Sequence, residues 1–398
     1  MAELSEISGQ SATPALAADH GQAGLYLHIP FCLRKCPYCS FYSRPPQQGD
    51  FTLFTEAILA HVELLARHAQ VQDVQFSTIF FGGGTPSVLP AQQLSTLLHA
   101  CRETCSFADD PEISIEVNPG TVDARSLQGL RQAGWNRLSI GVQSFKDGEL
   151  GRLGRIHSAQ DARQTVSDAR GAGFANISLD LMYGLPGQQL EDWRYTLEQA
   201  LSLEPAHLSL YELTPEEPSP LYDAIQRSTT TLPHEDEILA MMACTEALIT
   251  ASPLSRYEIS NYARPGRQCR HNLNYWHNGS YLGLGPGAVS SLAGCRYSIP
   301  PDLSRYHHLA CSGQSAWIAE ECLSPEQSFR ETVIMGLRML EGVSARTLMQ
   351  RYQLDLRTYY GTVLDRLIDQ GLLVWRNDSL ALTRKGLPLA NQVMAALV

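Results

Sequence analysis

The sequence predicts an α/β protein whose main body is an open six-unit (β/α)6 partial TIM barrel, followed by a mainly helical, winged-helix-like C-terminal domain. Six short runs rich in β-branched and aromatic residues recur along the chain, separated by stretches with helical spacing. Runs that are apolar on both faces indicate a parallel sheet buried beneath helices. Because six units are two short of a complete barrel, we expect an open one, with a doubly wound open sheet as the alternative.

The predicted strands are short and follow one another at similar spacing. They are residues 24–29 (GLYLHI), 77–82 (STIFFG), 112–117 (EISIEV), 137–142 (RLSIGV), 176–181 (NISLDL) and 207–213 (HLSLYEL). The clearest helical spacing lies between them, at residues 54–68, 91–101 and 192–203. A strand followed by a helix, repeated in series, predicts parallel pairing of the strands.

From about Pro325 the pattern changes to helices followed by a small hairpin. Two short strands meet at Asn377 and Asp378, and a last helix is predicted from Arg384, so the region resembles a winged-helix module. Such modules often bind DNA, but the formal net charge of −11 argues against a broad phosphate-binding face. We therefore expect a packing or partner-docking role and no nucleic-acid partner.

The N-terminal residues 1–22 are rich in Ala, Ser, Gln and Gly and predict a disordered lead-in. The first cationic residue is Arg34, so the chain begins without the basic region of a signal peptide, and no apolar run approaches the length of a membrane span. We expect a cytoplasmic protein that is not transmembrane. In such a protein the ten cysteines favour metal or redox chemistry over disulfides.

These shifts in composition predict four regions. They are the lead-in at 1–22, the partial barrel at 23–256, a connecting segment that contains HNLNYW at 257–323, and the winged-helix-like domain at 324–398. Three glycines follow the HNLNYW sequence, at Gly283, Gly285 and Gly287. They predict a tight loop, because they do not form the strand-to-helix turn of a dinucleotide site.

Three cysteines follow the first predicted strand at its carboxyl end. Cys32, Cys36 and Cys39 have the spacing C-x3-C-x2-C, and parallel α/β folds place their chemistry at this end of the strands. Iron-sulfur clusters that only carry electrons use four thiolates, so three thiolates leave one iron open for a ligand. A structural zinc site that recruits His28 is an alternative, although the sequence offers no clear second ligand pair.

The cysteine spacing resembles that of the radical S-adenosylmethionine (SAM) superfamily. The wider frame resembles the coproporphyrinogen dehydrogenase-like branch, through YLHIPFCLRKCPYC, FFGGGTPS, IEVNPG, SIGVQSF, LGRIHS and DLMYGLPGQ in this order. The match runs from about residue 24 to beyond 290. It implies a 4Fe-4S cluster bound by the three cysteines, with SAM on the open iron and reductive cleavage of SAM as the expected chemistry.

The resemblance also implies a SAM site built from the ends of successive strands. Glycines let the backbone approach a ligand without interference from a Cβ, and the GGGTP loop is the family position for the methionyl part of SAM. A carboxylate such as Glu116 can accept hydrogen bonds from two hydroxyl groups. The implied SAM-contacting residues are Tyr26, Tyr38, Gly83, Gly84, Thr85, Glu116, Gln143, Arg155, Asp180 and, as a weaker match, Thr214.

The HNLNYW segment points to haem. Histidine is the usual proximal haem ligand, and Tyr275 and Trp276 offer flat apolar surface to a porphyrin. H-N-x-x-Y-W resembles a motif of haem chaperones in the same branch, which implies a haem-binding role for His271. Outside this frame His271 would be a structural histidine, and for Cys269 we expect packing, with haem attachment as its alternative.

One position departs from the dehydrogenases of this branch, which carry a further cysteine where this chain has Phe41. A substrate with four propionates also favours cationic partners, yet residues 1–33 contain neither Lys nor Arg. We therefore expect a haem chaperone on a radical SAM scaffold that passes haem to an acceptor apoprotein. The alternatives are an oxygen-independent coproporphyrinogen III dehydrogenase and a radical enzyme with another substrate.

Overall fold

The computed structural model describes residues 22–67, 71, 74–292 and 294–398. Six parallel strands form the centre of its main sheet and cover the six predicted segments, apart from Leu213. Their bounds are β1 Gln22–Ile29, β2 Gln75–Gly83, β3 Ser106–Val117, β4 Arg137–Gln143, β5 Asn176–Tyr183 and β6 His207–Glu212. The predicted lead-in lies outside the described residues, except for Gln22, which begins β1.

Short strands that the sequence patterns did not predict extend both edges of this sheet. They are β7 Ser255–Arg256, β8 Asn261–Ala263, β9 Tyr281–Leu284, β10 Val289–Leu292, β11 Cys295–Ser298 and β12 Ile318–Cys322. Within the described residues the strand order is β12-β11-β10-β9-β1-β2-β3-β4-β5-β6-β8-β7. Strand β9 pairs in parallel with β1, whereas β8 pairs antiparallel with β6. Strands of two to five residues carry too little periodicity to be predicted.

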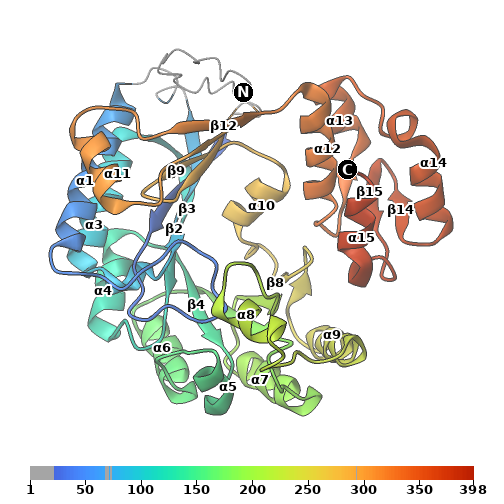
Figure 1. Cartoon of the computed structure of the whole chain (residues 1–398), viewed down its shortest axis with the longest axis horizontal. Helices are drawn as coiled ribbons and strands as arrows, with labels where there is room; N and C mark the ends of the chain where they lie inside the picture. The colour runs from blue at the N-terminus through green and yellow to red at the C-terminus, as the bar shows by residue number, and fades with distance from the viewer. Residues whose placement is uncertain (1–21, 68–70, 72–73, 293) are drawn as a thin grey trace.

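The helices before the C-terminal part include those that connect the parallel strands and cover the outside of the sheet, and one at residues 270–276 that lies on its inner side, against β1 and β2 (Figure 1). They are α1 Asp50–Ala66, α3 Ala91–Thr104, α4 Ala124–Ala133, α5 Asp147–Arg152, α6 Ala159–Gly171, α7 Leu190–Ser202, α8 Pro220–Gln226, α9 Glu235–Thr250, α10 Arg270–Trp276, α11 Leu303–Cys311 and the short η1 Pro86–Val88. Local sequence fixes several of their starts. The side chains of Asp123 and Ser158 accept hydrogen bonds from backbone N–H groups in the first turns of α4 and α6.

A continuous apolar core lies between the sheet and these helices. Trp135 and Trp193 are among its largest fully buried side chains. The Trp135 ring packs edge-on against Phe81, with ring centroids 5.2 Å apart, and Trp193 donates its indole N–H to Thr245 Oγ1 at 2.9 Å. This packing holds the parallel strands in register, and so it positions the side chains that surround the barrel interior.

The C-terminal part of the chain has a second, smaller core. Its elements are α12 Pro325–Gly336, β13 Val343–Ser344, α13 Ala345–Tyr352, α14 Leu356–Asp369, β14 Leu373–Arg376, β15 Ser379–Leu382, η2 Leu387–Leu389 and α15 Ala390–Ala395. The hairpin is present, with Asn377 at a left-handed φ of 54° in its turn. The predicted start of the last helix was wrong. The Gly386 N–H donates to Thr383 Oγ1 at 2.9 Å, and this turn delays α15 to Ala390.

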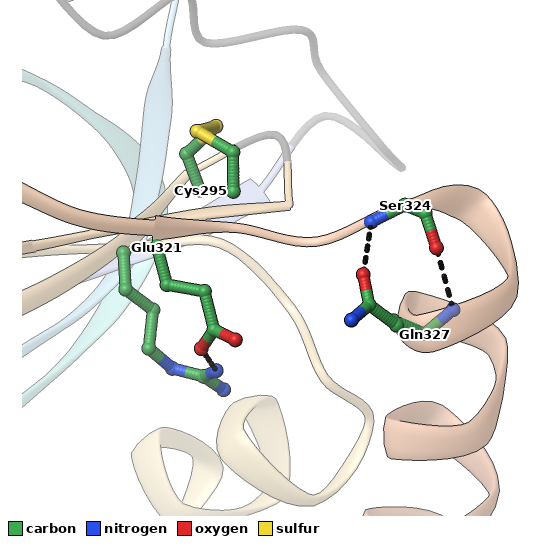
Figure 2. The surroundings of a disulfide bond; sticks show 6 residues. Cys295, Glu321, Ser324 and Gln327 are labelled. Atoms are coloured by element: carbon green, nitrogen blue, oxygen red, sulfur yellow. Dashed lines mark hydrogen bonds and ion pairs between the residues drawn. A yellow bond between two sulfur atoms is a disulfide. The ribbon is translucent and has the colours of Figure 1, made fainter. Parts of the chain in front are cut away.

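A disulfide fixes the edge strand that leads into this second core. Cys295 on β11 and Cys322 on β12 are directly paired across the two strands, contrary to the expectation that the cysteines avoid disulfides. Beside it, Glu321 forms an ion pair with Arg296 at 3.7 Å (Figure 2). Ser324 and Gln327 then form the capping box that begins α12 (Figure 2). The start of the second core is therefore anchored to the sheet.

Candidate functional site

The three predicted cluster cysteines lie on the loop that follows β1. The Arg44 N–H donates to the Pro30 carbonyl at 2.9 Å, and the Cys32 N–H donates to the Arg44 carbonyl at 3.1 Å, so the two ends of the loop are joined. Within it, the Cys39 N–H donates to the Cys36 carbonyl at 3.2 Å. All three cysteines are free and partly exposed. The loop therefore presents its thiols at the carboxyl end of the barrel.

Polar groups from two other segments contact these thiols. The Thr85 hydroxyl lies 3.4 Å from Cys32 Sγ, and Arg155 Nη1 donates to Cys36 Sγ at 3.8 Å. A hydroxyl and a guanidinium can both donate hydrogen bonds to sulfur, so they hold the two thiols in place. The structure thus brings Thr85 and Arg155, both predicted from the sequence, to the cluster loop.

The three thiols do not converge on a site for a single ion. Among the described residues, no three Cys, His, Asp or Glu side chains converge closely enough to hold one metal ion. A 4Fe-4S cluster takes each thiolate on a different iron, so its ligands stand further apart. His28, the alternative zinc ligand, is buried and bonded through Nδ1 to the Tyr26 hydroxyl at 3.1 Å and through Nε2 to the Tyr42 carbonyl at 2.8 Å. Its ring nitrogens are therefore already used.

The GGGTP loop after β2 packs against the start of the cysteine loop. The Gly84 N–H donates to the Ile29 carbonyl at 2.8 Å, and the Thr85 N–H donates to the Phe31 carbonyl at 2.7 Å. A Cβ on Gly84 would lie 2.7 Å from the Phe31 oxygen, and Gly83 has a left-handed φ of 107°. The glycines are needed for this close approach of two backbones, which places Thr85 beside the thiols.

A cavity of about 290 Å³ lies inside the barrel next to this loop, and we call it the barrel cavity. Side chains from β1 to β6 and from α10 line it. The lining residues are Tyr26, Phe80, Glu116, Arg137, Ser139, Asp180, Ser209, Tyr211, Cys269, His271, Asn272 and Tyr275. Four of the predicted site residues, Tyr26, Glu116, Asp180 and His271, are therefore brought together.

The barrel cavity contains a pair of buried carboxyl groups. Burial, reinforced by the negative charge of Asp180, raises the pKa of Glu116 to about 8, although a hydrogen bond from the Gly83 N–H at 3.2 Å opposes the shift. Burial also raises the pKa of Asp180, whose carboxyl oxygens accept from Ser139 Oγ at 2.8 and 3.0 Å. With a pKa of about 8, Glu116 is mostly protonated at neutral pH, so its carboxyl group can donate one hydrogen bond to a ligand and still accept others.

A second polar cluster lies beside the thiols at the end of β4. Arg155 Nη2 donates to the Gly141 carbonyl at 2.7 Å and also contacts Asn118 Oδ1. Asn118 Nδ2 in turn donates to Thr85 Oγ1 at 2.7 Å. A Cβ on Gly141 would lie 2.5 Å from Asn118 Oδ1 and 3.1 Å from Gln143 Nε2, so only glycine leaves room for this convergence. Arg155 and Gln143 thus belong to the rim of the cluster loop and not to the barrel cavity.

Tyr38 and Thr214 are two further predicted residues that lie outside the barrel cavity. Tyr38 packs beside an apolar cluster that contains Leu153 and Met182, and burial raises the pKa of its hydroxyl. This contact fixes the cysteine loop against the segments that follow β4 and β5. Thr214 is exposed on the loop after β6 and is absent from the cavity lining.

His271 is fully buried in the wall of the barrel cavity. Its Nδ1 lies 2.7 Å from Thr78 Oγ1, its Nε2 lies 2.9 Å from the Tyr275 hydroxyl, and its ring stacks on Phe80 with centroids 5.1 Å apart. Burial lowers the pKa of the imidazole to about 3, so the ring is neutral at physiological pH. A haem iron would have to displace the Tyr275 hydroxyl in order to reach Nε2.

Cys269 is also buried, directly before α10. Its thiol donates to Glu112 Oε1 at 3.6 Å, and burial raises its pKa to about 12. The same carboxylate accepts from the Arg270 and His271 N–H groups, each at 3.2 Å. Glu112 therefore holds the first turn of α10, and Cys269 is a neutral thiol that takes part in this packing.

Sequence reasoning missed several residues of the site, namely Thr78, Glu112, Asn118, Arg137, Ser139 and Tyr211. Arg137 is fully buried and donates to Asn176 Oδ1 at 2.9 Å and to the Arg267 carbonyl at 3.3 Å. Asn118 directly follows the strand predicted at 112–117. Its position at the carboxyl end of a parallel strand could therefore have identified it as a site residue. The others lie within strands, where a polar residue that faces the barrel interior looks like one that faces solvent.

Comparisons with known proteins agree with this geometry. Residues 26–200 match the Radical SAM superfamily, and residues 323–389 match the HemN C-terminal domain. A curated relative from Bacillus subtilis, named Heme chaperone HemW, is 34% identical over 94% of this chain and 98% of its own length. A relative of the same name from Escherichia coli is 44% identical over 66% of this chain and 68% of its own length.

A solved structure shares the whole architecture. It is coproporphyrinogen III oxidase (HemN) from Escherichia coli, described as a radical SAM enzyme, and it matches with a TM-score of 0.82 and 26% sequence identity. The match covers 94% of this chain and 89% of that one. The partial barrel and the C-terminal elements therefore recur together in that protein.

Proposed function

This chain belongs to the radical SAM superfamily and, within it, to the HemW family of haem chaperones, and from that premise we propose that it binds haem and passes it to an acceptor apoprotein. The observation that carries the proposal is the placement of the HNLNYW sequence. It forms helix α10, which packs against β1 and β2 at the wall of the barrel cavity. The motif therefore lies close to the predicted SAM site without being part of the cysteine loop.

Cys32, Cys36 and Cys39 would hold a 4Fe-4S cluster, with Thr85 and Arg155 in contact with the sulfur atoms of Cys32 and Cys36. When it is bound and reduced, such a cluster supplies an electron for the cleavage of SAM. Glu116 and Asp180 would accept hydrogen bonds from hydroxyl groups of SAM that enter the barrel cavity. Tyr26 would form part of the wall of this cavity. Gln143, Arg155 and the GGGTP loop would surround the part of SAM nearest the cluster.

His271 is our candidate for a haem-binding role within the HNLNYW segment. Its imidazole is neutral at physiological pH, which is the form that can bind iron. Its contacts with Thr78 and Tyr275 also fix α10 to the barrel. Loss of the ring should therefore weaken haem binding by the segment.

A second candidate function is oxygen-independent coproporphyrinogen III dehydrogenation, which the fold match to HemN favours. Two observations disfavour it. Phe41 is 65% exposed at the position where those dehydrogenases carry a further cysteine. Arg137 is the only Lys or Arg in the described lining of the barrel cavity, and it is committed to Asn176 and Arg267. Four propionates would lack cationic partners there.

The partners implied by this function are haem and an acceptor apoprotein, with no nucleic acid. A cytoplasmic location is part of the proposal. None of the helices in the described residues combines the length and the apolar character that a bilayer-spanning helix needs. The net charge of −11 opposes a general affinity for nucleic acid.

An anaerobic haem titration of the cluster-reconstituted protein tests the proposal, with an unrelated acidic protein as the reference and the His271→Ala variant beside the wild type. We expect saturable binding of one haem per chain that is weaker in the variant. Binding no stronger than that of the reference protein would contradict the chaperone function. A parallel incubation with coproporphyrinogen III, SAM and a reductant should yield no protoporphyrinogen, and its accumulation would establish the dehydrogenase instead.

A further inference from the structure

Helix α10 separates two cavities. Its His271 and Tyr275 face the barrel cavity, whereas Trp276 and the following His277 line a different cavity on the side of the C-terminal domain. Figure 1 shows α10 between the barrel strands and the helices α12 and α13, and α10 contacts both β2 and α12. We call the second space the interdomain cavity, and its lining includes Trp276, His277, Thr332, Glu341, Thr347 and Arg351.

The two cavities differ in volume. The interdomain cavity measures about 590 Å³ and the barrel cavity about 290 Å³. Sites for drug-sized ligands usually span about 300 to 1,000 Å³, so the barrel cavity lies at the lower limit of that range. A tetrapyrrole is a large, flat ligand, and only the interdomain cavity has a volume well inside the range. The barrel cavity also contains the carboxyl pair that we assign to SAM.

Trp276 lies in the wall of the interdomain cavity and carries a buried hydrogen-bond donor. Its indole Nε1 is buried and has no hydrogen-bond partner among the described residues. The Arg338 guanidinium covers one face of the indole at 4.3 Å, which fixes the ring. A buried N–H without a partner is unfavourable, so a ligand that brings an acceptor to it on binding would be favoured there. A haem propionate is such an acceptor.

His277 supplies an imidazole at the same place. It is the first residue after α10, and its N–H donates to the Leu273 carbonyl at 2.9 Å, so its backbone is fixed while its side chain is exposed. An imidazole is the usual haem ligand. Unlike His271, this ring can reach a ligand without breaking the contacts that hold α10 to the barrel.

Arg351 contributes positive charge from α13 on the far side of the interdomain cavity. Its Nη2 donates to the Asn278 carbonyl at 3.2 Å, so it also links α13 to the segment after α10. Glu341 contributes the opposing negative charge. A guanidinium forms charge-assisted hydrogen bonds with carboxylates, so Arg351 can contact a propionate.

We propose that the interdomain cavity holds the haem cargo, with His277 on the iron and with Trp276 and Arg351 donating hydrogen bonds to propionates. This assignment rests on the proposed function and specifies where the haem lies. An Fe–N bond forms, and no oxidation or reduction is involved. His271 then acts on haem binding as a positioning residue and not as an iron ligand, because its contacts with Thr78 and Tyr275 fix the helix that presents Trp276 and His277.

Haem titrations of the cluster-reconstituted full chain test this assignment, using the wild type and the variants His277→Ala, Trp276→Phe and His271→Ala. His99→Ala on α3 is the matched control, because His99 is exposed and pairs only with Glu103 at 3.1 Å in the described contacts. We expect His277→Ala to weaken haem binding by about tenfold or more and to shift the Soret band, since the axial ligand is lost. Trp276→Phe should weaken binding less and leave the band in place.

The outcomes separate this inference from the proposed function. If the wild type binds no haem, the proposed function is wrong. If the wild type binds one haem and His277→Ala behaves like His99→Ala, while His271→Ala shifts the Soret band, then the haem lies in the barrel cavity and the interdomain assignment is wrong. SAM binding by each variant reports its folding, and His277→Ala should retain it because His277 lies outside the barrel cavity.

Discussion

The barrel cavity and the interdomain cavity share one wall, helix α10, but they are built in opposite ways. In the barrel cavity the polar groups bind one another, as Ser139 binds Asp180 and Thr78 binds His271. In the interdomain cavity, the indole N–H of Trp276 has no partner among the described residues and His277 is exposed. Prearranged polar groups reduce the cost of binding a ligand in one orientation, whereas an adaptable site suits a ligand that must leave.

The difference follows from the two cores. The barrel cavity is enclosed by strands of one continuous core, while the interdomain cavity lies between that core and the C-terminal one. Backbone hydrogen bonds link the two parts, from the Ile259 N–H to the Arg338 carbonyl and from the Leu340 N–H to the Tyr257 carbonyl, each at 3.0 Å. Interfaces between domains generally permit relative motion. We therefore expect the interdomain cavity to change shape more easily than the barrel cavity.

The largest effect should come from removing one cluster ligand. Cys36→Ser should abolish the charge-transfer absorbance of the reconstituted cluster and the binding of SAM, because only two thiolates remain. Haem binding should persist, since the interdomain cavity does not include the cysteine loop. Absorption spectra and iron content check this result, with Cys311→Ser on the exposed end of α11 as the control. An unchanged cluster spectrum would contradict the ligand assignment.

The next effect concerns the carboxyl pair of the barrel cavity. Glu116→Gln should weaken SAM binding by tenfold to a hundredfold, about 1.4 to 2.7 kcal/mol, because an amide cannot ionise and so cannot accept hydrogen bonds from two hydroxyl groups through both of its terminal atoms. Haem affinity should not change. Anaerobic calorimetry measures both ligands, and Glu103→Gln on the surface of α3 is the control. Equal losses of SAM and haem affinity would show that the two ligands share one cavity.

The acid stability of the protein should depend on His271. Burial lowers its pKa to about 3, below its value of about 6.5 in an unfolded chain, so the unfolded state binds the additional proton between these values. The free energy of unfolding therefore falls as pH falls through this window, by up to about 1.4 kcal/mol per pH unit for one group. His271→Gln should reduce this slope.

Urea titrations of the cluster-free protein between pH 4 and pH 7 measure that slope. His28 and His207 also have a lowered pKa because of burial, so some acid dependence should remain in the variant. His99→Gln, at an exposed position on α3, is the matched control. A slope equal to that of the wild type in His271→Gln would mean that His271 is accessible to protons, contrary to its burial.

The smallest effect should come from the contact that anchors α10. Thr78→Val keeps the shape of a fully buried side chain but removes the hydroxyl that lies 2.7 Å from His271 Nδ1. The free energy of unfolding should fall by about 1 kcal/mol, since a buried ring nitrogen loses its partner. Thr96→Val on the exposed side of α3 is the control. If Thr78→Val leaves the free energy of unfolding unchanged, the contact between Thr78 and His271 does not anchor α10.

The parallel strands and the cysteine loop were predictable because their signals are local. A run such as 137–142 or the spacing from Cys32 to Cys39 is complete within a few residues. The edge strands β9 to β12 were not predictable, because each is stabilised by pairing across the sheet and not by its own periodicity. The disulfide between Cys295 and Cys322 was missed for the same reason, since it joins two such strands.

The residues of the candidate site also divide into those that have a local signal in the sequence and those that do not. Glu116 and Asp180 could be proposed from their positions at strand ends and from the resemblance to the superfamily. The contrast between His271 and His277 could not, because it depends on which face of α10 meets the barrel and which meets the C-terminal domain. That information is absent from a six-residue motif and appears only when three distant segments pack together.

The central claim is that SAM and haem occupy different cavities on the two sides of α10. The most direct test is an anaerobic haem titration of the cluster-reconstituted protein with and without saturating SAM. Separate cavities predict that both ligands bind at once, one of each per chain, with haem affinities that agree within about twofold. Displacement of SAM by haem, or a haem affinity that falls in proportion to the SAM concentration, would contradict the claim and place both ligands in the barrel cavity.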